Sequence, residues 1–177
     1  MKLIYLIPII FTIFFFKIAN AQTIVVVNIQ SLIDNNESYI DALKEIEISQ
    51  QAYLDEFKEK ESNLKKKFDY IEESKLILSE NEINIQIEKY NEQLANFTIL
   101  VEEFNIHYQN QILSIRDKVF QEIIPLLELY SIENKIDLIL DSTNYLIASN
   151  AINITQNINN ELKKINIKLE HNDFKEN

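Results

Sequence analysis

The chain has 177 residues, of which 17 are basic and 28 acidic, giving a formal net charge of −11, and it contains neither cysteine nor glycine. Without cysteine it can form no disulfide, thiolate metal site or cysteine nucleophile. The lack of glycine excludes P-loops, dinucleotide fingerprints and nucleophile elbows, and the acidic balance argues against nucleic acid as a partner.

The N-terminal segment has the layout of a secretory signal peptide. Met1-Lys2 gives it a positive start, an apolar stretch runs to Phe16, and Ala19-Asn20-Ala21 places small residues at a cleavage site. The apolar run of about 14 residues is shorter than the roughly 20 that span a bilayer. We predict export to the periplasm with cleavage after Ala21, and a short uncleaved anchor is the alternative. Cleavage leaves 15 basic and 28 acidic residues, a net charge of −13.

The mature chain begins with a short strand pattern. The β-branched run from Thr23 to Asn28 predicts a strand that is buried on both faces. Residues 31–33 can form one helical turn. The polar residues 34–36 then predict a break that supplies a cap for a following helix.

Two segments with heptad-like spacing follow, at about 40–78 and 82–120. The register of the first contains Ile40, Leu43, Glu47, Gln50, Leu54, Phe57, Glu61, Leu64, Phe68, Ile71, Lys75 and Leu78. The register of the second contains Ile83, Ile87, Tyr90, Leu94, Phe97, Val101, Phe104, Tyr108, Gln111, Ile115 and Lys118. A polar turn near 78–82 lies between them, so we predict an antiparallel coiled-coil hairpin with arms of about 60 Å. One uninterrupted helix is the alternative.

The pattern changes again after the second arm. Pro125 is expected to kink or restart the helix, because it lacks a backbone donor and clashes with the preceding turn. The run 136–140 predicts a second strand, and 145–148 a third that pairs with it as a β-hairpin around the polar turn 141–144.

A closing helix is predicted near the C-terminus. Asn153 and Gln156 have the spacing of a capping box. One face of this helix is marked by Ile154, Ile158, Leu162, Ile165 and Leu169. The polar tail from His171 onward is expected to be frayed.

Strands at both ends of the hairpin must meet in one body. The predicted fold is therefore mainly α with a small β body, from which a long antiparallel coiled-coil hairpin projects. The expected divisions are a signal peptide at 1–21, a body from 22–36 and 121–171, a hairpin at 37–120, and a flexible tail at 172–177.

Several blocks of sequence resemble the Skp/OmpH family of periplasmic chaperones. They are the residues 24–32 after the signal, the run 136–141, Asn153-Ile154-Thr155 before the closing helix, and Pro125 ahead of the second strand. The resemblance implies a homotrimer whose strands form a small barrel-like body. Three hairpins, or tentacles, would then enclose a cavity that holds unfolded outer-membrane proteins without ATP. The body positions implied are Val25, Val27, Leu138, Leu140 and Leu146.

One property departs from the family. Its familiar members are basic, whereas this chain is acidic, so we do not predict membrane contact from charge and expect apolar contacts to capture clients. The aromatic residues on the heptad register are expected to form the core between the arms. Lys65-Lys66-Lys67 is expected to be a solvated, salt-bridged face. The predicted client contacts are the apolar residues off the register: Tyr53, Ile77, Ile85, Ile99, Ile106 and Ile112.

No pattern in the chain indicates catalysis. His107 and His171 lack the spacing and the companion ligands of a zinc site, and no supported Ser/His/Asp set occurs. We therefore predict no enzymatic activity, no metal and no cofactor. A coiled-coil structural or adaptor protein of the cell envelope is the alternative function, but it would have no need of strands beside its helices.

Overall fold

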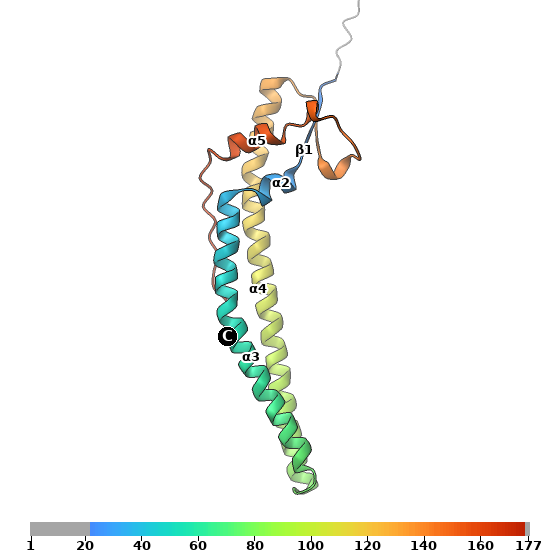
Figure 1. Cartoon of the computed structure of the whole chain (residues 1–177), viewed down its shortest axis with the longest axis vertical. Coiled ribbons are helices and arrows are strands. Elements are labelled where there is room, and N and C mark those ends of the chain that lie inside the picture. The colour runs from blue at the N-terminus through green and yellow to red at the C-terminus, as the bar shows by residue number, and fades with distance from the viewer. Residues whose placement is uncertain (1–21, 176–177) are drawn as a thin grey trace, which may run out of the picture.

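The computed structural model describes residues 22–175, so the predicted signal peptide and the last two residues lie outside the described part. In chain order the elements are β1 (Ile24–Val27), α2 (Ile29–Asp34), α3 (Glu37–Ser74), α4 (Glu80–Asn134), β2 (Leu138–Asp141), the 3₁₀ turns η1 (Ser142–Asn144) and η2 (Asn150–Ile152), and α5 (Thr155–Leu162). Helices α3 and α4 lie antiparallel as a long hairpin that projects from a small body (Figure 1). The predicted hairpin and body are thereby confirmed.

The ends of the hairpin helices are capped by side chains. Asn36 precedes α3 and accepts from the Tyr39 N–H at 3.1 Å, as the predicted break requires. The turn at the tip lies at 75–79, slightly before the predicted one, and Ser79 and Glu82 form a capping box at the start of α4. Hydrogen bonds from the Ser79 hydroxyl and backbone N–H lower the pKa of Glu82 below its usual value.

The first half of α3 packs one residue out of the predicted register. Tyr39, Ala42 and Ile46 are buried there, whereas the prediction placed Ile40, Leu43 and Glu47 in the core. Both registers coincide at Phe57. Phe57 lies 18 positions after Tyr39, which corresponds to five turns at about 3.6 residues each, so this half follows an undistorted helix rather than a heptad. The polar Glu47 and Gln50 in the predicted register were the sequence signal of this shift.

Helix α4 continues through Pro125 to Asn134, so the predicted restart of the helix is wrong. Proline removes one backbone hydrogen bond from the helix. On either side of it, Ile123 and Leu127 are buried against the core. Burial of two such side chains stabilises by about 3 kcal/mol or more, which offsets the cost of the proline.

The body is organised around β1. This strand pairs in parallel with β2, with Ile24 opposite Leu138, and on its other side Val26 bridges Asn153. Val26 and Val27 are fully buried, which confirms the predicted burial of the first strand. β2 begins two residues later than predicted, because the Ile136 N–H bonds to the Ser131 carbonyl and so belongs to the cap of α4.

The predicted third strand at 145–148 is not formed in the described residues. Asp141 accepts from the Thr143 N–H and starts the turn η1, which leads the chain away from β2. Tyr145 has extended backbone angles, but the following Leu146 and Ile147 are 105% and 91% exposed. The predicted β-hairpin between the second strand and residues 145–148 is therefore wrong for the single chain.

The closing helix is present but starts differently. The predicted capping box is wrong, because Asn153 accepts from the Thr155 N–H at 2.9 Å and the helix begins at Thr155 without a side-chain cap. The Thr155 hydroxyl accepts from the Asn28 N–H at 2.8 Å and links α5 to the junction between β1 and α2. The predicted apolar face is buried at Ile154, Ile158 and Leu162, where the helix ends.

The segment after α5 runs back beside α3 toward the middle of the hairpin (Figure 1). We call residues 163–175 the tail segment. Phe174 is only 5% exposed, so the expectation of a flexible tail is wrong for residues 172–175. The physical reason is a set of contacts with both hairpin helices, described below.

The lack of glycine leaves one strained position among the described residues. Lys135 ends α4 with φ 53° and ψ 47°, the left-handed conformation that glycine usually takes. That conformation costs a non-glycine residue roughly 1 kcal/mol or more. We expect Lys135→Gly to raise the free energy of unfolding by about 0.5–1 kcal/mol in urea denaturation. Lys135→Ala is the control: a similar gain from alanine would contradict the role of the backbone conformation.

Asp141 links β2 to α2, since its Oδ1 accepts from the Ile29 N–H at 3.1 Å and its Oδ2 from the Thr143 hydroxyl at 2.7 Å. Partial burial would raise its pKa, but these bonds and the backbone N–H groups of residues 142 and 143 outweigh burial and lower the pKa.

A lowered pKa in the folded state means that Asp141 stabilises the fold above the unfolded pKa, and that this contribution is lost as the pH falls through the folded value. We expect Asp141→Asn to cost about 1–2 kcal/mol at pH 7, and the difference from wild type to shrink below about pH 4. Urea denaturation at several pH values measures this. Asp69→Asn, on the exposed side of α3, is the control; a constant difference for Asp141→Asn across the pH range would contradict the assignment.

Candidate functional site

Four half-exposed apolar side chains are spaced along the exposed side of α4. They are Ile85, Ile99, Ile106 and Leu113, and their exposed fractions lie between 43% and 54%. They are spaced by multiples of seven residues, so they lie along one side of the helix over about 42 Å. We call these four residues the α4 stripe. Three of them were predicted as client contacts. Leu113 was missed, although its spacing of seven from Ile106 was the available signal.

The other predicted contact residues lie elsewhere. Ile77 is 84% exposed in the turn at the tip of the hairpin. Ile112 is half-buried and packs against the core. Tyr53 is also half-buried, because its ring lies against those of Phe104 and Phe174 at 5.8 and 5.4 Å. The structure therefore separates the predicted set into an exposed stripe, a tip residue and two residues within the packing of the hairpin.

The aromatic residues of the heptad register form the core between the arms in the half near the body. Phe57, Phe104 and Tyr108 are buried, and the ring of Phe104 lies 5.0 Å from Phe57 and 4.9 Å from Tyr108. Their steep interplanar angles are those of edge-to-face packing. The outer half is different: Phe68 pairs with Tyr90 at 5.7 Å but remains nearly half exposed.

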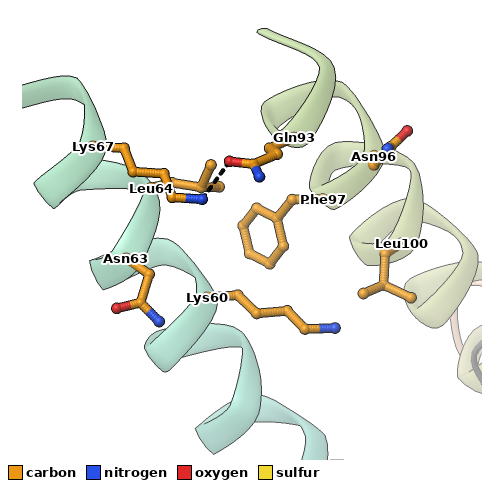
Figure 2. Close-up of a pocket in the computed structure, with 8 residues that line it drawn as sticks. All are labelled: Lys60, Asn63, Leu64, Lys67, Gln93, Asn96, Phe97 and Leu100. Atoms are coloured by element: carbon orange, nitrogen blue, oxygen red, sulfur yellow. Dashed lines mark hydrogen bonds between the residues drawn. The ribbon is translucent and has the colours of Figure 1, made fainter. Parts of the chain in front are cut away.

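The outer half of the hairpin is hollowed. A groove of about 280 Å³ lies between the arms beside Leu64 and Phe97, and Figure 2 shows the ring of Phe97 projecting from α4 toward α3. A second hollow of about 450 Å³ shares Leu64 and Phe97 and also reaches Phe68, Tyr90 and Leu94. Loose packing of this kind forfeits dispersion contacts, so the arms are held together less firmly at this level than near the body, although Ile71 and Ile83 are buried again next to the tip.

Charged groups surround these apolar surfaces. Lys67 Nζ donates to Gln93 Oε1 at 2.6 Å across the groove (Figure 2). Among residues 22–175, the run Lys65-Lys66-Lys67 makes no ion pair, so the predicted salt bridges of this face are wrong. A membrane span and a metal site were also sought among residues 22–175. None of the helices there has the length and hydrophobicity needed to span a bilayer, and no group of three His, Asp or Glu residues could hold a metal ion.

The body also presents apolar side chains to solvent. Leu138, Leu146 and Ile147 are exposed, together with Ile132 at the end of α4. In the described part of the chain, β2 pairs with β1 alone, so its outer edge is unpaired. The predicted body residues divide accordingly: Val25 and Val27 are buried within the chain, Leu140 is half-buried, and Leu138 and Leu146 are exposed.

Comparison with known proteins gives a consistent result. The sequence matches the model of a family described as outer membrane protein (OmpH-like) over residues 23–162. A search among curated proteins found no match. The structure resembles the crystal structure of a candidate outer membrane chaperone (OmpH-like) from Caulobacter crescentus CB15, with a TM-score of 0.65 and 11% sequence identity. The likeness covers 81% of this chain and 85% of that chain, and it concerns the fold.

Proposed function

The chain belongs to the OmpH-like family of outer membrane proteins, and from this premise we propose that it is an ATP-independent periplasmic chaperone that holds unfolded outer-membrane proteins before their insertion. The protein is exported with a signal peptide that is cleaved after Ala21. It acts by binding alone, without a cofactor or a catalytic step.

The observation that carries this proposal is the exposed α4 stripe. A hairpin needs apolar residues only where its two helices meet, yet Ile85, Ile99, Ile106 and Leu113 lie outside that contact. Polar residues such as Glu92 and Glu103 separate these side chains along the helix, so the α4 stripe offers spaced apolar contact points rather than one continuous patch. Unfolded chains offer many apolar side chains but no fixed shape, so a long shallow stripe suits them better than a pocket.

The working form is a homotrimer. The unpaired edge of β2 and the exposed Leu138, Leu146 and Ile147 support this part of the proposal, because such an edge promotes association unless it is covered. In the trimer the three bodies cover each other and the hairpins surround a shared cavity. The α4 stripes line that cavity, and many weak contacts on three arms add to a useful affinity.

Charge has a minor role in this mechanism. The mature chain has a net charge of −13, so it does not attract acidic clients or anionic lipid in general. The hollows between the arms in the outer half of the hairpin allow the arms to adjust to clients of different size.

Replacing the stripe tests the proposal. We expect the triple variant Ile99→Gln, Ile106→Gln, Leu113→Gln to need about tenfold more protein than wild type to stop a denatured outer-membrane β-barrel protein from aggregating on dilution. Each half-exposed side chain contributes up to about 1 kcal/mol of apolar contact, and the loss is multiplied over the arms. Light scattering without nucleotide measures the suppression.

The matched control is Ile48→Gln, because Ile48 is 73% exposed but lies on α3 and not on the α4 stripe. It should behave as wild type. No suppression by the wild-type protein at several-fold excess would refute the holding function, and full suppression by the triple variant would refute the role of the stripe.

A further inference from the structure

The tail segment occupies a site built from aromatic side chains of both hairpin helices. The rings of Tyr53, Phe104 and His107 lie 5.4, 5.6 and 5.7 Å from the ring of Phe174. Tyr108 completes the site, since its hydroxyl accepts from the Phe174 N–H at 3.4 Å. We call Tyr53, Phe104, His107 and Tyr108 the aromatic socket. Phe174 is buried in it although the surrounding sequence is polar.

The socket and its neighbours also bind the backbone of the tail. Tyr53 Oη donates to the Phe174 carbonyl. His107 Nε2 lies 2.7 Å from the Asn172 carbonyl and donates to it, and the Asn172 N–H donates to Gln111 Oε1 at 3.2 Å. Both backbone groups of residues 172 and 174 are therefore bonded, as a neighbouring strand would bond them.

Few of these contacts depend on the sequence of the tail. One further side-chain bond is strong: Ser49 Oγ donates to Asp173 Oδ1 at 2.6 Å. A weaker contact joins His171 and Glu45 at 3.6 Å. Every other contact named above is made to the peptide backbone or to one aromatic ring. Any extended segment with a single aromatic side chain has the same groups.

We propose that the aromatic socket is a binding site for an extended segment of an unfolded protein that carries an aromatic side chain, and that the tail segment fills it as a displaceable substitute. The identity of the occupant rests on the proposed chaperone function. The tail covers an apolar site in the empty protein. A client segment displaces Phe174 from the socket only when its other contacts along the hairpin make the client bind more strongly than the tethered tail. The tail therefore favours long unfolded chains over short peptides.

Peptide binding to the full-length protein tests this inference. The probe is a fluorescein-labelled decapeptide with one central Phe among Ser and Asn residues, which lacks the other side chains of the tail. Fluorescence anisotropy should show that Phe174→Ala binds the peptide about tenfold more tightly than wild type, because the internal competitor is lost. The same peptide with Ala in place of Phe should not bind measurably.

Two further variants identify the site. Adding Tyr53→Phe to Phe174→Ala keeps the ring but removes the backbone donor, and should weaken peptide binding several-fold. Tyr70→Ala is the control, because Tyr70 is an exposed aromatic residue on α3 away from the socket, and it should bind like wild type. Equal peptide affinity for wild type and Phe174→Ala, or equal binding of the Ala peptide, would overturn the inference.

The outcome is separable from that of the proposed function. If Phe174→Ala binds the Phe peptide more tightly than wild type does, but neither wild type nor this variant suppresses aggregation of a β-barrel client, the socket inference is supported and the holding function is refuted. If wild type and Phe174→Ala both suppress aggregation but bind the peptide equally, the holding function is supported and the socket inference is refuted.

Discussion

Replacing Leu146 and Ile147 with glutamate is expected to convert the proposed trimer into monomers. These two side chains are almost fully exposed in one chain, although they follow closely on β2, whose outer edge is unpaired. Burial of a leucine and an isoleucine in a subunit interface is worth about 3–6 kcal/mol per chain. The double variant loses that contribution and places six carboxylates in one small body, where they repel one another.

Light scattering coupled to size-exclusion chromatography measures the change in mass. The matched control is Leu76→Glu, which adds a charge at an equally exposed leucine in the turn at the tip of the hairpin, far from the body. It should remain trimeric. A double variant with the mass of a trimer would place the interface elsewhere, and a monomeric wild-type protein at micromolar concentration would refute the trimer itself.

The largest loss of stability is expected from Tyr108→Ala. Tyr108 is 1% exposed, and its ring packs against Phe104 while its hydroxyl bonds to Ser49 Oγ at 2.6 Å. Removing a large buried ring leaves a cavity between the two arms and costs about 3–5 kcal/mol. The same change detaches the Phe174 N–H, so the tail segment loses a contact as well.

Chemical denaturation followed by circular dichroism gives the free energy of unfolding, compared at one protein concentration because association contributes to apparent stability. Tyr108→Phe separates the hydroxyl from the ring and should cost only about 1 kcal/mol. Tyr70→Ala, the exposed control, should cost less than about 0.5 kcal/mol beyond helix propensity. A loss below about 1 kcal/mol for Tyr108→Ala would contradict its position in the core.

The features that depend on short-range patterns were predictable from the sequence. Apolar residues three and four apart predicted the two long helices, and the β-branched run 24–27 predicted a buried strand. The register of α3 was wrong over its first half, because a spacing of 3.5 and one of 3.6 residues per turn differ by less than one residue over several turns. Only packing against α4 decides between them.

The remaining errors concern partners that a single sequence does not display. The run 145–148 has strand composition, but the turn η1 leads it away from the free edge of β2, so it pairs with no strand within the described residues. The polar composition of residues 171–175 predicted a frayed end, whereas one phenylalanine and a set of backbone bonds hold it in place. Hydrogen bonds to the backbone of the tail do not depend on its side chains, so the composition of the tail does not reveal them. For the same reason nothing in the sequence indicated that Tyr53 contacts the tail segment.

The parallel pairing of Ile24 with Leu138 has a consequence for the order in which the protein can assemble. These residues are 114 positions apart, so β1 has no strand partner until nearly the whole chain is available for folding. Direct closure of such a loop is slow for a disordered chain. The hairpin forms from local contacts and shortens the path, since the start of α3 and the end of α4 then lie at the same end of the molecule (Figure 1). We therefore expect the arms to fold first and the body to close last, so that in the proposed trimer the contacts between subunits form only after each chain has closed its body.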